Sequence, residues 1–198
     1  MTQKEEDSFL KRSYINQTHG YIDIFPRREL WMKMAEEFNG NFKISHTRSY
    51  VIEYLELRIP YKDSELIFTE SDTRPLKIEC EFISKIPYNL IIGDEDMFEK
   101  LLKRFGKKEI EIGNPEFDGH YLIESKDTDL TTNLLSTDIA GFILKCKVYS
   151  ISFSTNLKKQ TSSLISVINR FVDEAETFRD VVVLHFKLLD KLSEISII

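Results

Sequence analysis

Two of three successive stretches between residues 55 and 82 place apolar side chains at every second position. In the first and third stretches these side chains are Leu55, Leu57 and Ile59, and Leu76, Ile78, Cys80 and Phe82. The segment between them, residues 64–71, is bounded by turn-forming residues. A period of two is typical of a strand with one buried face. Because no helical pattern separates the three segments, the sequence predicts an antiparallel meander.

Helical periodicity surrounds this meander. Pro26 begins a helix that ends at Asn39-Gly40 and carries on one face Leu30, Trp31, Met34, Ala35 and Phe38. Residues 94–106 have an Asp N-cap, an apolar face and a Gly stop, and residues 128–145 predict one or two short helices broken near Ser136. Further strands are expected at 88–93 and 148–153, and a hairpin at 108–113 and 121–125.

The segment 162–172 fits either a strand or a helix. As a helix it places on one face Leu164, Ile165, Ile168, Phe171 and Val172, and as a strand Ile165, Val167 and Phe171. A strand is favoured, because Asp173 and Glu176 then resemble a capping box. From there apolar residues keep helical spacing to the end of the chain.

These patterns predict an α+β fold. We expect a predominantly antiparallel sheet of roughly seven or eight strands with amphipathic helices packed on it, including a long C-terminal helix. Residues 1–25 have no sustained periodicity and are expected to form a polar N-terminal segment, the polar lead-in, that precedes a single domain over residues 26–198.

Charge and cysteine content narrow the function classes. The net charge of −6 argues against nucleic acid as a partner. Cys80 and Cys146 are too few for a disulfide framework and form no CxxC pair. The N-terminus has no signal-peptide pattern and no window is apolar enough to span a membrane, so a cytoplasmic location is expected, with peripheral membrane association left open.

Local motifs for cofactors and nucleophiles are missing from the sequence. The four histidines form no HxH or HExxH pair, so no metal site is expected. Neither GxGxxG, GxxxxGK[ST] nor GxSxG occurs, so no nucleotide or other cofactor is expected.

The stretch GNPEFDGHYLIES, residues 113–125, offers the best candidates for acid–base chemistry. If the stretch is extended, Glu116, Asp118 and His120 share one face and could serve a hydrolase-like enzyme. The alternative is an ordinary polar turn, in which Phe117 packs back onto the core. The turn is favoured.

Two surfaces could meet a partner. A basic cluster of Lys103, Arg104, Lys107 and Lys108 complements the dipole at the end of the predicted helix 94–106 and could also hold an anion. The last helix could support self-association through Val181, Val182, Leu188, Leu189 and Ile195.

The chain resembles a group of uncharacterised bacterial α+β proteins of unknown function. The residues that carry the resemblance are Trp31, Ala35 and Gly40, the stretch from Gly113 to Ile123 with Phe117, Asp118 and Tyr121, Leu134-Leu135, and the leucine-rich last helix. The resemblance implies a shared α+β fold and no known activity. Members often carry membrane helices, and no such helix is found in this sequence.

Taken together, the sequence favours a non-enzymatic binding or protein-interaction domain of a bacterial protein, whose partner is an unknown protein or a second copy of the chain. The alternative is the hydrolase-like enzyme with its site around Glu116, Asp118 and His120.

Overall fold

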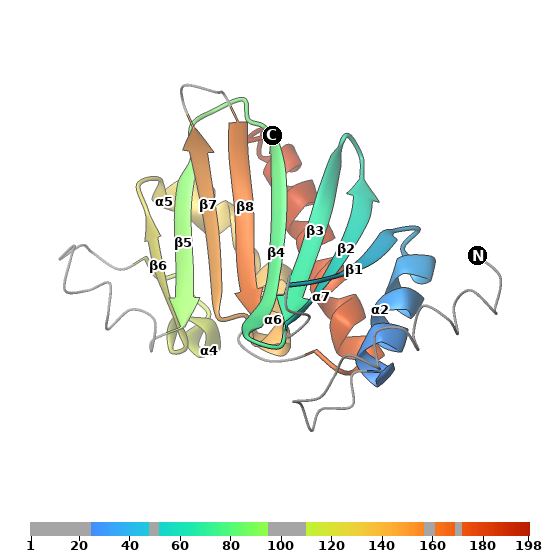
Figure 1. Ribbon diagram of the computed structural model, residues 1–198. Coiled ribbons are helices and arrows are strands. Elements are labelled where there is room, and N and C mark those ends of the chain that lie inside the picture. Colours follow the sequence, from blue (N-terminus) through green and yellow to red (C-terminus); the bar gives the residue numbers. More distant parts are fainter. Residues whose placement is uncertain (1–24, 48–51, 95–109, 157–160, 169–171) are drawn as a thin grey trace.

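A single eight-stranded sheet organises the chain, in the order β1-β2-β3-β4-β8-β7-β5-β6 (Figure 1). The computed structural model describes residues 25–47, 52–94, 110–156, 161–168 and 172–198. The strands are β1 Asn41–His46, β2 Glu53–Tyr61, β3 Ser64–Ser71, β4 Arg74–Ile83, β5 Asn89–Asp94, β6 Tyr121–Ser125, β7 Ser150–Asn156 and β8 Thr161–Ile168. All the pairings are antiparallel, as the alternating segments predicted.

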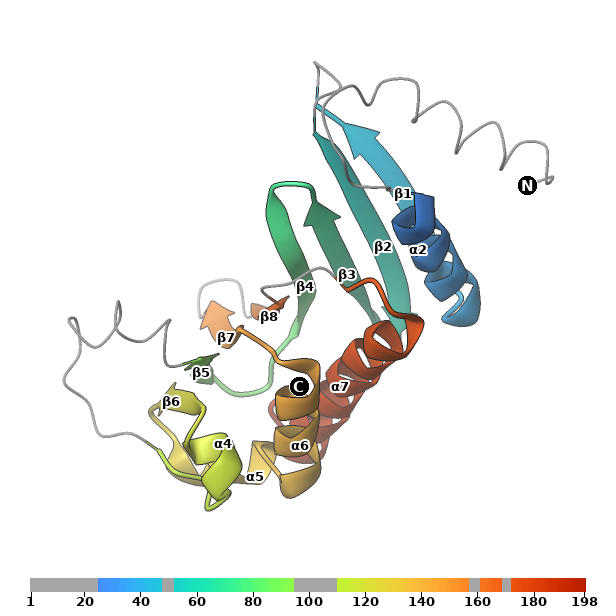
Figure 2. The ribbon, with the colours of Figure 1, turned by 90° about the horizontal axis from the view of Figure 1, so that it is seen from below.

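The helices of the described residues lie on one face of the sheet and leave the other face open (Figure 2). They are α2 Phe25–Glu37, α4 Pro115–Asp118, α5 Thr128–Leu134, α6 Thr137–Cys146 and α7 Ala175–Glu194. The sheet curves around the long C-terminal helix α7, which packs against α6 and α2. The predicted α+β architecture is therefore confirmed, and so is the break between two short helices at Ser136.

The predicted meander is formed by β2, β3 and β4, β1 adds a further antiparallel strand beside β2, and β8 joins β4 to the rest of the sheet. β8 pairs over its whole length with β4, from Leu76↔Ile168 to Ile83↔Thr161, and β7 pairs with the other side of β8. These pairings join residues far apart in sequence, which local periodicity does not reveal.

The ambiguous segment 162–172 forms a strand over its described part, but with the opposite face inward from the one we expected. Ser162, Leu164, Ser166 and Ile168 are buried, while Ile165 and Val167 are half-buried on the open face. The register with β4 decides this, because Ser166 lies opposite the inward-facing Ile78. The capping box is also wrong: α7 is capped at Glu174, with no capping bond from its side chain.

The predicted hairpin around residues 113–125 is wrong. β6 pairs with β5, from Leu90↔Ser125 to Asp94↔Tyr121, while Ile110–Ile112 belong to no strand. Between them Asn114 accepts hydrogen bonds from the N–H groups of Glu116 and Phe117 and begins the short helix α4. Phe117 is fully buried against Tyr121, as predicted for an aromatic residue anchored to the core.

Several predictions fall on residues outside the described ranges. These are nearly all of the polar lead-in, the helix predicted for 94–106 apart from Asp94, which ends β5, and the basic cluster Lys103, Arg104, Lys107 and Lys108.

Candidate binding groove

β3 and β4 pair at one end only, and the sheet splits beyond it. The pairing runs from Ser71↔Arg74 to Ile67↔Glu79. Past this point β3 continues along β2, where Ser64 pairs with Tyr61, and β4 continues along β8, where Ile83 pairs with Thr161. Figure 1 shows the two strands moving apart toward the β2–β3 turn, with α7 visible in the gap.

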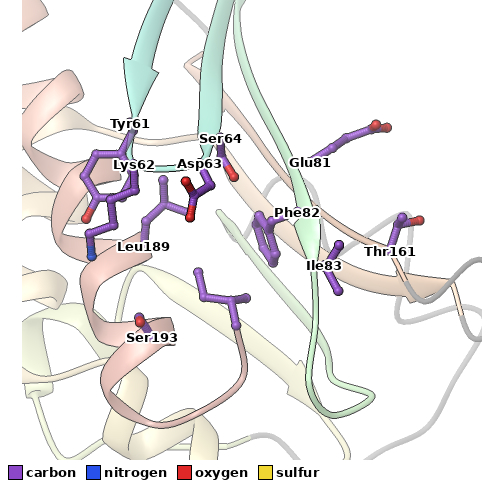
Figure 3. A pocket seen from close by; sticks show the side chains of 11 residues that line it. Tyr61, Lys62, Asp63, Ser64, Glu81, Phe82, Ile83, Thr161, Leu189 and Ser193 are labelled. Carbon is purple, nitrogen blue, oxygen red and sulfur yellow. The ribbon is translucent and has the colours of Figure 1, made fainter.

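A groove of about 510 Å³ occupies this split. Its walls come from the β2–β3 turn and from the end of β4, and its floor comes from the last turn of α7 and the residues after it (Figure 3). Phe82 and Ile198, both half-buried, supply apolar surface inside the groove, and the buried Leu189 lies beneath it. Its size lies within the range of natural ligand pockets, which are lined mainly by apolar side chains.

The apolar surface continues outside the hollow. Ile83, on the groove wall, is 77% exposed, and Ile86 just beyond β4 is 38% exposed. They are the exposed large hydrophobic residues of the described chain. Contiguous apolar surface, here a hollow next to an exposed isoleucine, is more typical of interaction sites than a single scattered exposed residue.

The charged groups around the groove fall into a paired set and an unpaired set. Asp190 accepts hydrogen bonds from the Tyr61 hydroxyl and, at 2.7 Å, from Lys62 Nζ. Lys62 and Tyr61 hold the pKa of Asp190 below its usual value, while burial and then Asp190 raise the pKa of Tyr61. Asp63 and Glu81, in contrast, form no ion pair within the described residues.

The sequence contained a signal for this groove that our interpretation missed. The alternation from Leu76 to Phe82 places Lys77, Glu79 and Glu81 on the open face, so the next residue on that face is Ile83. An isoleucine in the polar phase of a strand is out of pattern. The split itself has no local signature, because it depends on how β3 and β4 follow different neighbours.

The candidate acid–base residues Glu116, Asp118 and His120 do not form a joint site. Asp118 accepts hydrogen bonds from the backbone N–H groups of Ile112 and Gly113, at 3.0 and 2.9 Å, so its role is to hold the loop. His120 Nδ1 donates to the Glu116 carbonyl at 2.9 Å. Alternate residues share a face only in an extended chain, and residues 115–118 are helical.

Glu116 and His120 do line a second hollow, of about 590 Å³, with Asp94, Lys145 and Lys147. Both residues are exposed, and Lys145 is paired with Asp180 at 2.8 Å. Within the described ranges no three His, Cys, Asp or Glu side chains converge closely enough to hold a metal ion. This hollow therefore offers an open polar surface and no assembled acid–base machinery.

A buried cluster of charges lies between the first turn of α2 and the sheet. Arg28 is fully buried and donates from Nε to Glu53 at 3.0 Å, with a second bond between the same two side chains. Arg27 bonds Glu70 at 3.1 Å and Asp72 at 2.8 Å. Each fully buried charge in the cluster faces an opposite charge. These pairs join α2 to β2 and β3, so we interpret the cluster as a structural contact that holds α2 on the sheet.

The residues proposed for self-association belong to the core of the chain itself. Val181, Val182, Leu188 and Leu189 are at most 1% exposed, and Ile195 is half-buried against the same core. Their helical stripe was correctly recognised, but it faces the sheet, so these side chains are not available to a second copy.

No helix in the described ranges is both long and apolar enough to cross a membrane. No protein-family model matches the chain, and no curated protein matches it in sequence. Its fold is similar to the crystal structure of the mycobacterial trehalose monomycolate transport factor A, TtfA, with a TM-score of 0.53 and 10% sequence identity, over 86% of this chain and 96% of that one. At this identity the likeness concerns the fold alone.

Proposed function

We propose that the chain is a non-enzymatic binding domain that holds an apolar part of a partner in the groove between β3 and β4. The observation that carries the proposal is the continuity of apolar surface from the hollow, at the half-buried Phe82 and Ile198, to the projecting Ile83. In water this surface is unfavourable unless a partner covers it, since apolar burial contributes about 25 cal/mol per Å².

Two further observations support a binding role. Glu116, Asp118 and His120, the best candidates for catalysis, point to different partners, and Asp118 is occupied by the backbone. The structural neighbour is named as a transport factor, so a protein with this fold carries a name that denotes transport.

Filling the groove tests the proposal. Ser193 is exposed and lines the groove from α7, so Ser193→Trp places a large side chain in the hollow without disturbing the buried core. We expect the fluorescence of the apolar dye 8-anilinonaphthalene-1-sulfonate, which reports exposed apolar pockets, to fall by more than half in this variant.

The matched control is Glu194→Trp, which adds the same side chain at the next position, outside the groove lining. It should leave dye binding unchanged. If both variants bind the dye as the wild type does, the groove is not an apolar binding surface and the proposal fails.

A further inference from the structure

We infer that the partner enters the groove as an extended polypeptide segment, which adds as a strand to the free edge of β4. This inference rests on the proposed function, because it names the occupant of the same groove. It goes beyond that function in stating that backbone hydrogen bonds, as well as apolar contact, hold the partner.

The free edge is the part of β4 that has lost β3 as a neighbour. Residues Glu81, Phe82 and Ile83 pair with β8 on one side, and within the described part of the chain none of them pairs with β3 on the other. Backbone groups of a strand point alternately to both sides, so this stretch presents N–H and C=O groups toward the groove. β3 leaves the same kind of edge at Ser64 on the opposite wall.

The chain itself already uses the continuation of this edge. Just beyond β4, the Lys85 N–H donates to the carbonyl of Ile197 at 2.8 Å, and Lys85 Nζ donates to the Ile198 carbonyl at 2.9 Å. Ile198 also lines the groove. Non-helical backbone therefore already forms hydrogen bonds just past the end of β4, and an incoming segment would add hydrogen bonds along Glu81 to Ile83.

Side chains and charges define the chemistry of the segment. A strand beside β4 would present alternate side chains to the apolar hollow and to Ile83 on the open face. A free acyl chain would fill the hollow but satisfy none of the backbone groups. Asp63 and Glu81, which form no ion pair with any other described residue, favour lysine or arginine at the ends of the segment.

The experiment is selection from a random peptide library displayed on phage, against the whole immobilised chain. The expected result is enrichment of extended sequences with alternating apolar residues and basic flanks. The enriched peptides are then synthesised and titrated by fluorescence anisotropy. Replacing their backbone N–H groups by N-methyl groups should weaken binding at least about tenfold, because each lost backbone hydrogen bond lowers the affinity.

Two variants of the chain locate the bound peptide. Ile83→Ser removes the projecting apolar side chain, which is too exposed to support the fold, and should weaken binding roughly tenfold or more. The control Ile91→Ser makes the same change on the open face of β5, remote from the groove lining, and should have no effect on affinity.

A library without binders, binders that tolerate N-methylation, or binders insensitive to Ile83→Ser would each overturn strand addition. The dye experiment separates this failure from failure of the proposed function. If Ser193→Trp abolishes dye binding while no peptide is enriched, the groove is an apolar site for a different occupant, and only the inference about its partner is refuted.

Discussion

Two buried titratable groups should make the stability of this protein respond to pH in opposite directions. His185 lies on α7 with no exposed surface, and its Nδ1–H donates to the Val181 carbonyl at 2.7 Å. Burial lowers the pKa of His185 to about 4 from 6.5. Burial raises the pKa of Glu70 to about 7 from 4.5, although Arg27 opposes that rise.

The signs follow from which state holds the proton. Below pH 6.5 the unfolded chain protonates His185 while the folded chain does not until about pH 4, so stability is lost as the pH falls through this window. For Glu70 the folded state holds the proton up to about pH 7 and the unfolded state only to 4.5, so stability is lost as the pH rises. At about 1.4 kcal/mol per pKa unit, each group changes the free energy of unfolding by about 2 kcal/mol between pH 5 and pH 7.

In the wild type these two contributions to the pH dependence of stability nearly cancel. Removing either group therefore makes the contribution of the other measurable. His185→Leu retains a buried apolar side chain of similar size and should lower the free energy of unfolding at pH 7, relative to pH 5, by about 2 kcal/mol more than in the wild type. Glu70→Gln should raise the free energy of unfolding at pH 7, relative to pH 5, by about the same amount. All other groups titrate alike in the three proteins, so they drop out of the comparison.

Urea denaturation at pH 5, 6 and 7, followed by the fluorescence of Trp31, measures these differences. Trp31 is the single tryptophan of the chain, is fully buried and contacts Phe42 and Phe178, so its emission reports unfolding. If His185→Leu and the wild type lose or gain stability with pH in parallel, then burial does not exclude the proton from His185 and the linkage reasoning is refuted.

Two other substitutions test the packing around the candidate sites by urea denaturation. Phe117→Ala should lower the free energy of unfolding by about 3–5 kcal/mol, because the ring is fully buried against Tyr121. His120→Ala, at an exposed position of the same turn, should change it by less than about 0.5 kcal/mol. Similar values for the two variants would refute the anchoring role of Phe117. Arg28→Met should cost about 3 kcal/mol because it leaves the Glu53 carboxylate buried without its guanidinium, and the double variant with Glu53→Gln should recover part of that loss, so an additive double variant would argue against a coupled pair.

Local patterns in the sequence predicted most elements because each pattern reports burial of one face. The alternation at Leu76 to Phe82 and the stripe from Phe178 to Leu192 correspond to residues that face the same core. The strand 161–168 was also recognised, but its inward face was not, because Ser162 and Ser166 are buried there while Ile165 faces the open side. Which face of a strand points inward depends on its register with the neighbouring strand. For this strand the neighbour is β4, which lies far away in sequence.

The candidate sites were harder to predict for a related reason. A hairpin at residues 108–125 was expected because turn-forming residues separate two strand-like segments, yet β6 pairs with β5 instead. The groove lies where β3 pairs with β2 but no longer with β4, and β4 pairs with β8. It therefore depends on pairings between strands and not on any single strand. The out-of-phase Ile83 indicates an apolar residue at the surface beside the groove, but the sequence does not indicate the split itself.

The open face of the sheet and the split within it present different surfaces to a partner. On the open face, opposite charges pair within strands and between them: Arg58 bonds Glu56 of its own strand at 2.7 Å and Glu65 of β3 at 2.9 Å, and Lys77 bonds Glu79 of its own strand at 2.6 Å. Such exposed pairs add little stability but keep a sheet face hydrated and unattractive to other sheets. At Ile83 that pattern ends and free backbone edges begin, so the split between β3 and β4, rather than the broad open face, is where a partner gains both apolar burial and hydrogen bonds.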